Sequence, residues 1–199
     1  MTSLPSAHFD AIYAEDPDPW RFRSSAYEQG KYAATLATLP RDRYRRGFEA
    51  ACSVGVLTQM LAGRCDNLLA TDAAAAPLQT ARELCGHAPH VRFRQGRIPE
   101  DWPDGPHDLI VLSEVLYYLD AADVQRVARQ AAACLEPGGH VVLVHWLAAA
   151  EPPFPLRGDA ASTLFITAAA PQLRVLAGHR TPQYRLDLLQ RIEDSVLPR

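Results

Sequence analysis

The chain has 199 residues, 48% of them hydrophobic and 22% charged, which fits one soluble globular domain with a substantial core. The net charge of −3 argues against a nucleic-acid-binding protein, and the local basic run Arg41, Arg43, Arg45 and Arg46 is expected to be a solvated surface. No apolar run reaches membrane-spanning length, and the first 20 residues lack the basic and apolar regions of a signal peptide.

The cysteines favour a cytoplasmic protein. They are scattered and form no CxxC pair, which is typical of reduced thiols rather than of a disulfide framework: Cys52, Cys65, Cys85 and Cys134. The segment CGHAPH, residues 85–90, supplies too few convergent ligands to predict a metal site.

The first 40 residues are rich in aromatic side chains and predict helices that cover one end of a sheet, with residues 41–199 forming the core of the same domain. In the core, short apolar runs alternate with helical patterns. The predicted strands are 48–51, 68–72, 91–93, 107–115 and 140–146, and the predicted helices are 55–62, 77–84 and 120–135. The sequence EPGG, residues 136–139, is expected to end the third helix. This alternation predicts an α/β fold, with a doubly wound parallel sheet between two layers of helices.

The C-terminal part breaks this alternation. Proline and glycine predict a loop over residues 148–160, and two apolar runs around a turn-like HRTPQ predict an antiparallel strand pair over residues 173–192.

Ligands of open parallel sheets bind beyond the carboxyl ends of the strands, which directs attention to the residues there. Asp72 ends the second predicted strand, where a carboxylate can accept hydrogen bonds from ribose hydroxyls; alternatively it caps the next helix. Glu114 follows the fourth strand and could orient or deprotonate an amine, or cap a short helical turn. His145 ends the fifth strand, either as a second candidate proton acceptor or as a structural residue.

The turn FEAACSVGVLT, residues 48–58, discriminates between cofactors. The dinucleotide spacing GxGxxG would fall on Ala51, Ser53 and Val56, which is a poor match. The looser spacing ExGxGxG instead aligns Glu49, Ala51, Ser53 and Gly55. That pattern suits a cofactor without phosphates, whose amino-acid end lies against the turn.

Several segments together resemble the NodS-like family of class I S-adenosylmethionine (SAM)-dependent methyltransferases. They are HFDAIYAEDPDPWRF, YEQGKYAATLATLP, CSVGVLT, HDLIVLSEVLYYLD and LEPGGHVVLVHW, and the resemblance runs from about residue 8 to about residue 192. It implies a seven-stranded, mostly parallel Rossmann-like sheet with an antiparallel final strand, SAM as methyl donor, and N-methylation of the free amine of a deacetylated chitooligosaccharide.

The resemblance also implies site residues. The cofactor-binding set comprises Trp20, Tyr32, Glu49, Ala51, Cys52, Ser53, Gly55, Asp72, Arg97, Ile98 and Ser113. Two of these depart from the family pattern. Ala51 stands where a glycine is expected and would be strained at positive φ, by about 1–2 kcal/mol. Arg97 stands where related enzymes often place an acid near the adenine, so the Ile98 N–H is expected to read the adenine edge.

The expected reaction is methyl transfer to an amine or hydroxyl of a small molecule, with S-adenosylhomocysteine (SAH) as product. Glu114, then His145, would direct the amine proton, while Trp20, Tyr117 and Tyr118 wall the site. The acceptor could be an amino sugar, a deacetylated chitooligosaccharide or another small molecule. Alternatives are a degenerate methyltransferase fold acting as a scaffold and, less favoured, a Rossmann dehydrogenase. The expected assembly is a monomer or homodimer without nucleic-acid or membrane partners.

Overall fold

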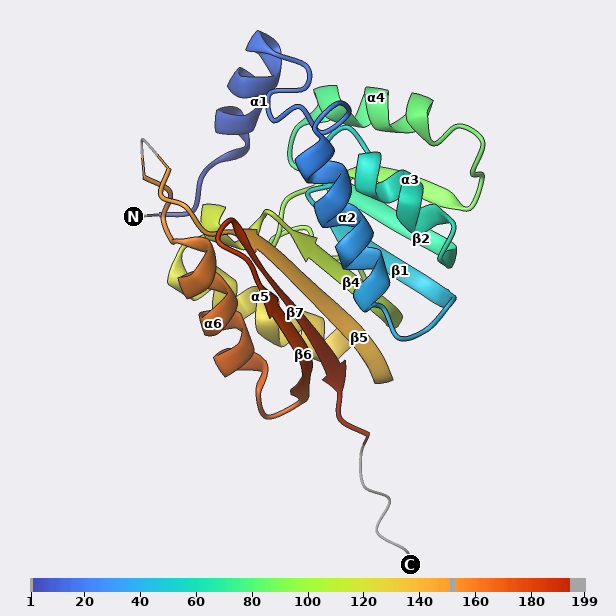
Figure 1. Cartoon of the computed structure of the whole chain (residues 1–199), viewed down its shortest axis with the longest axis vertical. Coiled ribbons are helices and arrows are strands. Elements are labelled where there is room, and N and C mark those ends of the chain that lie inside the picture. Colours follow the sequence, from blue (N-terminus) through green and yellow to red (C-terminus); the bar gives the residue numbers. More distant parts are fainter. Residues whose placement is uncertain (1, 151–152, 194–199) are drawn as a thin grey trace, which may run out of the picture.

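Seven strands form one mixed sheet in the order β3-β2-β1-β4-β5-β7-β6 (Figure 1). The computed structural model describes residues 2–150 and 153–193. Strands β1 to β5 run parallel, whereas β7 is antiparallel to both β5 and β6. This confirms the predicted sheet. The strand bounds are β1 Tyr44–Ala50, β2 Cys65–Asp72, β3 Val91–Gln95, β4 His107–Ser113, β5 Leu135–Trp146, β6 Leu173–Arg180 and β7 Tyr184–Arg191.

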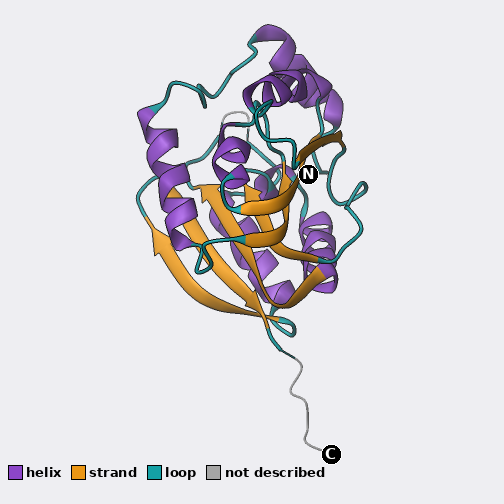
Figure 2. Cartoon of the chain, turned by 90° about the vertical axis from the view of Figure 1, so that its right-hand side faces the viewer, coloured by secondary structure: helices purple, strands orange, loops and turns teal. Residues whose placement is uncertain are grey.

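Helices cover both faces of the sheet, which gives the predicted three layers (Figure 2). Their bounds are α1 Ser6–Glu15, α2 Ala26–Thr38, α3 Val56–Ala62, α4 Ala75–Leu84, η1 Leu116–Tyr118, α5 Ala121–Cys134 and α6 Gly158–Ala169. Leu109 and Val111 of β4 pack toward α2 and α3, while Ile110 and Leu112 pack toward α5 and α6. Within the described ranges, every helix is too short or too polar to cross a membrane.

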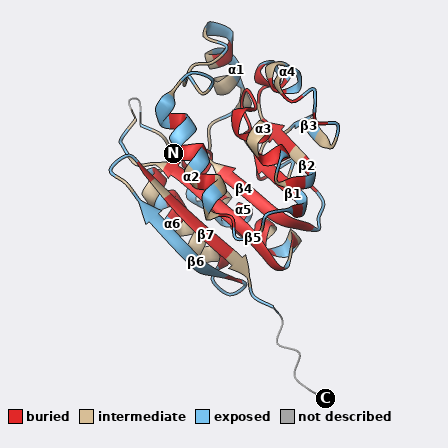
Figure 3. Cartoon of the chain, turned by 45° about the vertical axis from the view of Figure 1, so that its right-hand side comes forward, coloured by how far each residue is buried: buried red, intermediate tan, exposed pale blue. Residues whose placement is uncertain are grey.

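Burial is deepest at the centre of the sheet and falls away toward β6 (Figure 3). The four apolar residues 109–112 of β4 are fully buried, as expected for a parallel strand covered on both faces. By contrast, β6 is an edge strand whose residues after Leu173 are exposed. A register shift between Val175 and Ala177 interrupts its pairing with β7.

The largest differences between predicted and observed segment boundaries concern β1, β5 and α6. Strand β1 begins at Tyr44 rather than Phe48, because exposed arginines pair along the strand's start and hide its apolar signal. Helix α5 ends at Cys134, just before EPGG, as predicted, but β5 begins at Leu135 rather than His140 and includes residues 136–139, where Gly138 adopts φ +70°. Helix α6 begins at Gly158, inside the predicted loop; residues 151 and 152 of that loop lie outside the described ranges.

Candidate active site

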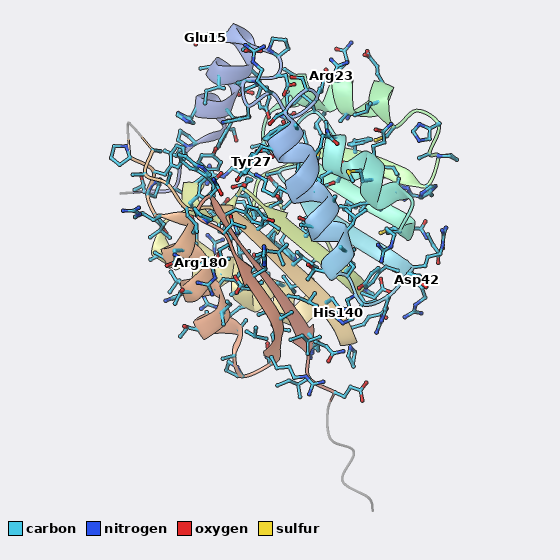
Figure 4. The ribbon with its side chains drawn as sticks, viewed as in Figure 1. Glu15, Arg23, Tyr27, Asp42, His140 and Arg180 are labelled. Carbon is cyan, nitrogen blue, oxygen red and sulfur yellow. The ribbon has the colours of Figure 1, made fainter. Side chains whose placement is uncertain are left out.

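A cavity of about 500 Å³ lies beyond the carboxyl ends of β1, β2 and β4, with residues of α1 and α2 in its wall. Strand β1 lies between β2 and β4. The chain builds the sheet outward from β1 through β2 and β3 on one side and from β4 on the other, so the direction of strand order reverses beside this cavity. Tyr27, which lines the cavity, lies at this end of the molecule, whereas His140 and Asp42 lie toward the opposite end (Figure 4).

The structure brings all but two of the predicted site residues to this cavity. Those that line it are Trp20, Tyr32, Glu49, Ala51, Cys52, Ser53, Asp72, Arg97, Ile98, Ser113, Glu114 and Tyr117. Gly55 and His145 are not among the lining residues. The individual roles of the lining residues remain predictions.

The turn after β1 uses left-handed backbone at three positions. Ala51 has φ +57°, Ser53 has φ +50° and Gly55 has φ +83°. The Tyr13 hydroxyl of α1 donates to Ser53 Oγ at 2.6 Å, which ties the N-terminal cover to the turn. Non-glycine residues at positive φ are strained, and such strain gathers at functional sites.

Gly55 has a packing role, and its predicted cofactor contact stays a prediction. It is the N-cap of α3, and a Cβ added to it would lie 2.7 Å from the Ala81 Cβ of α4. Glycine is therefore required there by its positive φ and by the close approach of α4 to the turn.

Replacing Ala51 by glycine is expected to relieve the strain at this position, as the observed φ of +57° requires. The gain in unfolding free energy should reach about 1 kcal/mol, since the relief is partly offset by glycine's greater backbone entropy. Removing the methyl group from the cavity wall should also tighten SAH binding. Chemical denaturation and calorimetric titration measure the two effects; weaker SAH binding would show that the turn does not face the cofactor.

Asp72 accepts two backbone hydrogen bonds at the end of β2, and its contact with the ribose stays a prediction. Its Oδ2 accepts from the Ser53 N–H at 2.9 Å, and its Oδ1 accepts from the Ala74 N–H at 3.0 Å, just before α4. The carboxylate is buried and lines the cavity. Burial raises its pKa to about 6. A carboxylate has about four lone-pair sites, so it retains capacity for ribose hydroxyls.

Glu49 is the most isolated carboxyl group of the site. It is 2% exposed and lines the cavity, and its Oε2 has no hydrogen-bond partner in the described part of the chain. Burial raises its pKa to about 8. An unsatisfied buried acceptor at a cavity wall is suited to a ligand that brings a hydrogen-bond donor.

Glu114 is held by three donors. Its backbone adopts φ +56°, and its Oε1 pairs with the Lys31 ammonium. Its Oε2 accepts from the Tyr117 hydroxyl at 2.9 Å and from the Trp146 N–H at 2.8 Å. With three donors on its two oxygens, the carboxylate has little acceptor capacity left for a ligand. The geometry therefore favours a positioning role over the predicted leading role as proton acceptor.

His145 lies behind the cavity wall, which corrects its candidacy as a second proton acceptor. The ring is fully buried; its Nε2 accepts from the Leu116 N–H at 3.1 Å, and its Nδ1 lies 3.1 Å from Ser162 Oγ. Burial lowers its pKa to about 3. With both nitrogens engaged, His145 acts as the structural residue of the alternative interpretation.

Two charged residues of α2, Glu28 and Lys31, were not predicted as site residues from the sequence. Lys31 is 3% exposed, pairs with both Glu28 and Glu114, and lies over the Tyr27 ring at 5.3 Å. We call Glu28, Lys31 and Glu114 the ion triad. One signal was available, because Lys31 is the only lysine in the sequence. A compact ammonium with three donors fits between two carboxylates, where a guanidinium fork would need more room.

Aromatic side chains form most of the remaining wall. Phe154 stacks on Tyr117 with 5.2 Å between ring centroids, and Trp20 stacks on Phe22 at 5.6 Å. Arg97 lines the cavity while its side chain bonds Glu100 at 3.0 Å. Among the described residues, no cluster of three or more potential ligands is arranged to hold a metal ion.

Sequence comparison places the chain in a family. The family described as Nodulation protein S (NodS) matches residues 12–143. The chain belongs to the NodS family. Nodulation protein S of Bradyrhizobium diazoefficiens is 34% identical over 122 residues, which cover 60% of this chain. The match spans only 58% of that protein, and 59% of a second relative from Sinorhizobium fredii.

Solved structures agree with the NodS fold. A candidate methyltransferase from Pseudomonas syringae is 40% identical, with a TM-score of 0.72 over 84% of this chain and all of that one. The N-methyltransferase NodS from Bradyrhizobium japonicum WM9, in complex with SAH, is 21% identical. Its TM-score is 0.79 over 94% of this chain and 98% of that one, which shows a shared fold.

Proposed function

We propose that this NodS-family protein is a SAM-dependent N-methyltransferase that acts on a primary amine of a small molecule, with an amino sugar or a deacetylated chitooligosaccharide as the favoured acceptor. One observation carries the proposal. A single cavity joins the turn after β1 and the β2 carboxylate Asp72 to a second polar region, the ion triad. Family membership and the SAH complex of a NodS protein support the same cofactor.

The residues present fit the cofactor. Asp72 would accept the ribose hydroxyls, and the turn from Ala51 to Ser53 would lie against the amino-acid end, with Glu49 as a partner for its ammonium. Ile98 and Arg97 line the wall where the adenine is expected. SAM, when bound, supplies an already activated methyl group, so the protein mainly provides proximity and orientation.

Residues of the N-terminal segment, Leu4, Phe9 and Tyr13, form part of the cavity wall. The Leu4 N–H donates to the Tyr118 carbonyl at 2.9 Å, and Phe9 packs edge-on against the Tyr118 ring. Tyr13 reaches the cofactor turn through Ser53. The acceptor amine must be neutral when it attacks the methyl group, so an amine that arrives as an ammonium requires a group that takes up its proton.

Transfer of radiolabelled methyl from SAM tests the proposal. With glucosamine tetramer as acceptor, label should enter the sugar fraction, and N-acetylglucosamine tetramer, which lacks the free amine, should remain unlabelled. Labelling of both tetramers would indicate O-methylation. If neither is labelled although SAH binds, the acceptor is another small molecule, which a panel of primary amines would identify.

The scaffold alternative rests on Ala51 and Arg97, the two departures from the family pattern. Both line the cavity, and the backbone accommodates Ala51 at positive φ. A scaffold would show no SAH binding at millimolar ligand. The less favoured Rossmann dehydrogenase would change NADH fluorescence on mixing.

Four unbridged cysteines support the expected cytoplasmic setting.

A further inference from the structure

Tyr27 differs from the other tyrosines of the cavity wall because a ligand outside the cavity can reach it. It lies in the first turn of α2, lines the cavity and is 41% exposed (Figure 4). Tyr13, Tyr32 and Tyr117 also line the cavity, but they are buried. A side chain that both lines a cavity and meets solvent stands at the cavity mouth. Large exposed aromatic side chains at such a position are typical of ligand contacts.

Two neighbours hold the Tyr27 ring in place. The Lys31 ammonium lies over the ring, 5.3 Å from its centroid, and the Tyr184 ring of β7 meets it at 70° with 6.4 Å between centroids. Because the side chain of Lys31 is 2% exposed, the face that it covers is the inner one, and the solvent-exposed part of Tyr27 lies on the other side. A ring fixed in this way loses little conformational freedom when a ligand packs on it.

Tyr27 also lies at the acceptor end of the cavity. Its neighbour Lys31 belongs to the ion triad, which marks the polar region away from the cofactor turn. A cavity of about 500 Å³ that also holds the cofactor cannot enclose a sugar tetramer as well, so the units beyond the reacting one must leave through the mouth. A β-linked glucosamine ring has a flat face of C–H groups, which packs against the face of an aromatic ring while the hydroxyls point to water.

We propose that Tyr27 is the residue that selects an oligosaccharide acceptor, because a sugar unit beyond the methylated one stacks on the exposed face of its ring. The inference rests on the proposed methyltransferase function and adds a specificity-determining residue to it. The predicted aromatic walls did not include Tyr27.

Replacing Tyr27 by leucine keeps an apolar side chain beside Lys31 but removes the flat ring. With glucosamine tetramer as acceptor and radiolabelled SAM, Tyr27→Leu should raise KM for the tetramer at least ten-fold and change kcat less than two-fold. Tyr27→Phe, which keeps the ring, should have a KM within three-fold of the wild-type value. Calorimetry should show the same SAH affinity in all three proteins, because the cofactor turn is intact.

A matched control is Leu176→Ala on β6, which shortens an apolar side chain of similar exposure, 42%, outside the described cavity wall. It should leave KM unchanged. An unchanged KM in Tyr27→Leu would overturn the inference, and so would equal damage to KM, kcat and SAH affinity, because that pattern marks a purely structural role. If the wild-type protein binds SAH but does not methylate the tetramer, the favoured acceptor is wrong and the inference falls with it, so the two failures are distinguishable.

Discussion

Replacing Lys31 by methionine should lower the free energy of unfolding by about 3–5 kcal/mol at neutral pH, because it leaves the buried Glu28 and the partly buried Glu114 without their cation. The side chain of Lys31 is 2% exposed, and those of Glu28 and Glu114 are 10% and 13% exposed. Methionine fills a similar volume without the charge. Urea denaturation measures the change.

The pH dependence of the unfolding free energy should distinguish the loss of the Lys31 charge from a loss of packing. Burial lowers the pKa of Lys31, but its two carboxylate partners together outweigh burial and raise it. Its stabilising contribution is therefore complete at neutral pH and is lost only as pH rises through that raised pKa. In the Lys31→Met protein, protonation of the Glu28 carboxylate at low pH should recover part of the lost stability, because burial already raises its pKa.

An exposed pair supplies the control. Arg43→Met removes the partner of Asp66 at the surface, and the side chains of that pair are 58% and 46% exposed. It should change the unfolding free energy by less than about 1 kcal/mol. If Lys31→Met were as mild as Arg43→Met, the ion triad would not be holding α2 to the sheet.

Replacing Glu49 by glutamine should stabilise the ligand-free protein, and increasingly so as the pH rises from 5 to 8. The carboxyl group is fully buried with one unpartnered oxygen, and its pKa rises from 4.5 to about 8 on folding. Between these values the folded protein holds a proton that the unfolded chain has lost, so the wild-type protein loses stability as pH rises.

Glutamine resembles the protonated acid but does not titrate, so the variant lacks this loss. The difference between the two proteins should grow to roughly 3 kcal/mol by pH 8. Asp72, whose pKa of about 6 gives a slope of the same sign, is present in both proteins, so only its Coulombic interaction with Glu49 contributes to the difference between them. Thermal unfolding across this pH range provides the measurement. A difference in unfolding free energy that stays constant between pH 5 and pH 8 would mean that Glu49 does not titrate in this range.

Reduced SAH affinity in the variant would support Glu49 as a partner of the cofactor's ammonium.

Much of the fold could be predicted because the core strands are encoded by local runs of apolar residues. Residues 109–112 of β4 are a continuous apolar run, and they are fully buried. The antiparallel β6–β7 pair was visible as two apolar runs around a turn. Strand β1 was shortened in the prediction because Arg45 and Arg46 interrupt its apolar pattern, while their N–H groups bond Asp108.

The site was less predictable where it depends on contacts between distant segments. Asp72 and Glu114 could be located from strand ends alone. The pairing of Lys31 with Glu114 joins residues 83 positions apart, and no local pattern encodes it. His145 also ends a strand, but the alternation of the strand turns its ring into the core, toward Ser162 of α6.

Calorimetric titration of SAH into the purified protein tests the central claim most directly, which is that the cavity beyond β1, β2 and β4 binds this cofactor. The expected result is one site of micromolar affinity, weakened at least ten-fold by Asp72→Ala. Absence of binding at millimolar SAH to the folded wild-type protein would contradict the claim and favour the scaffold.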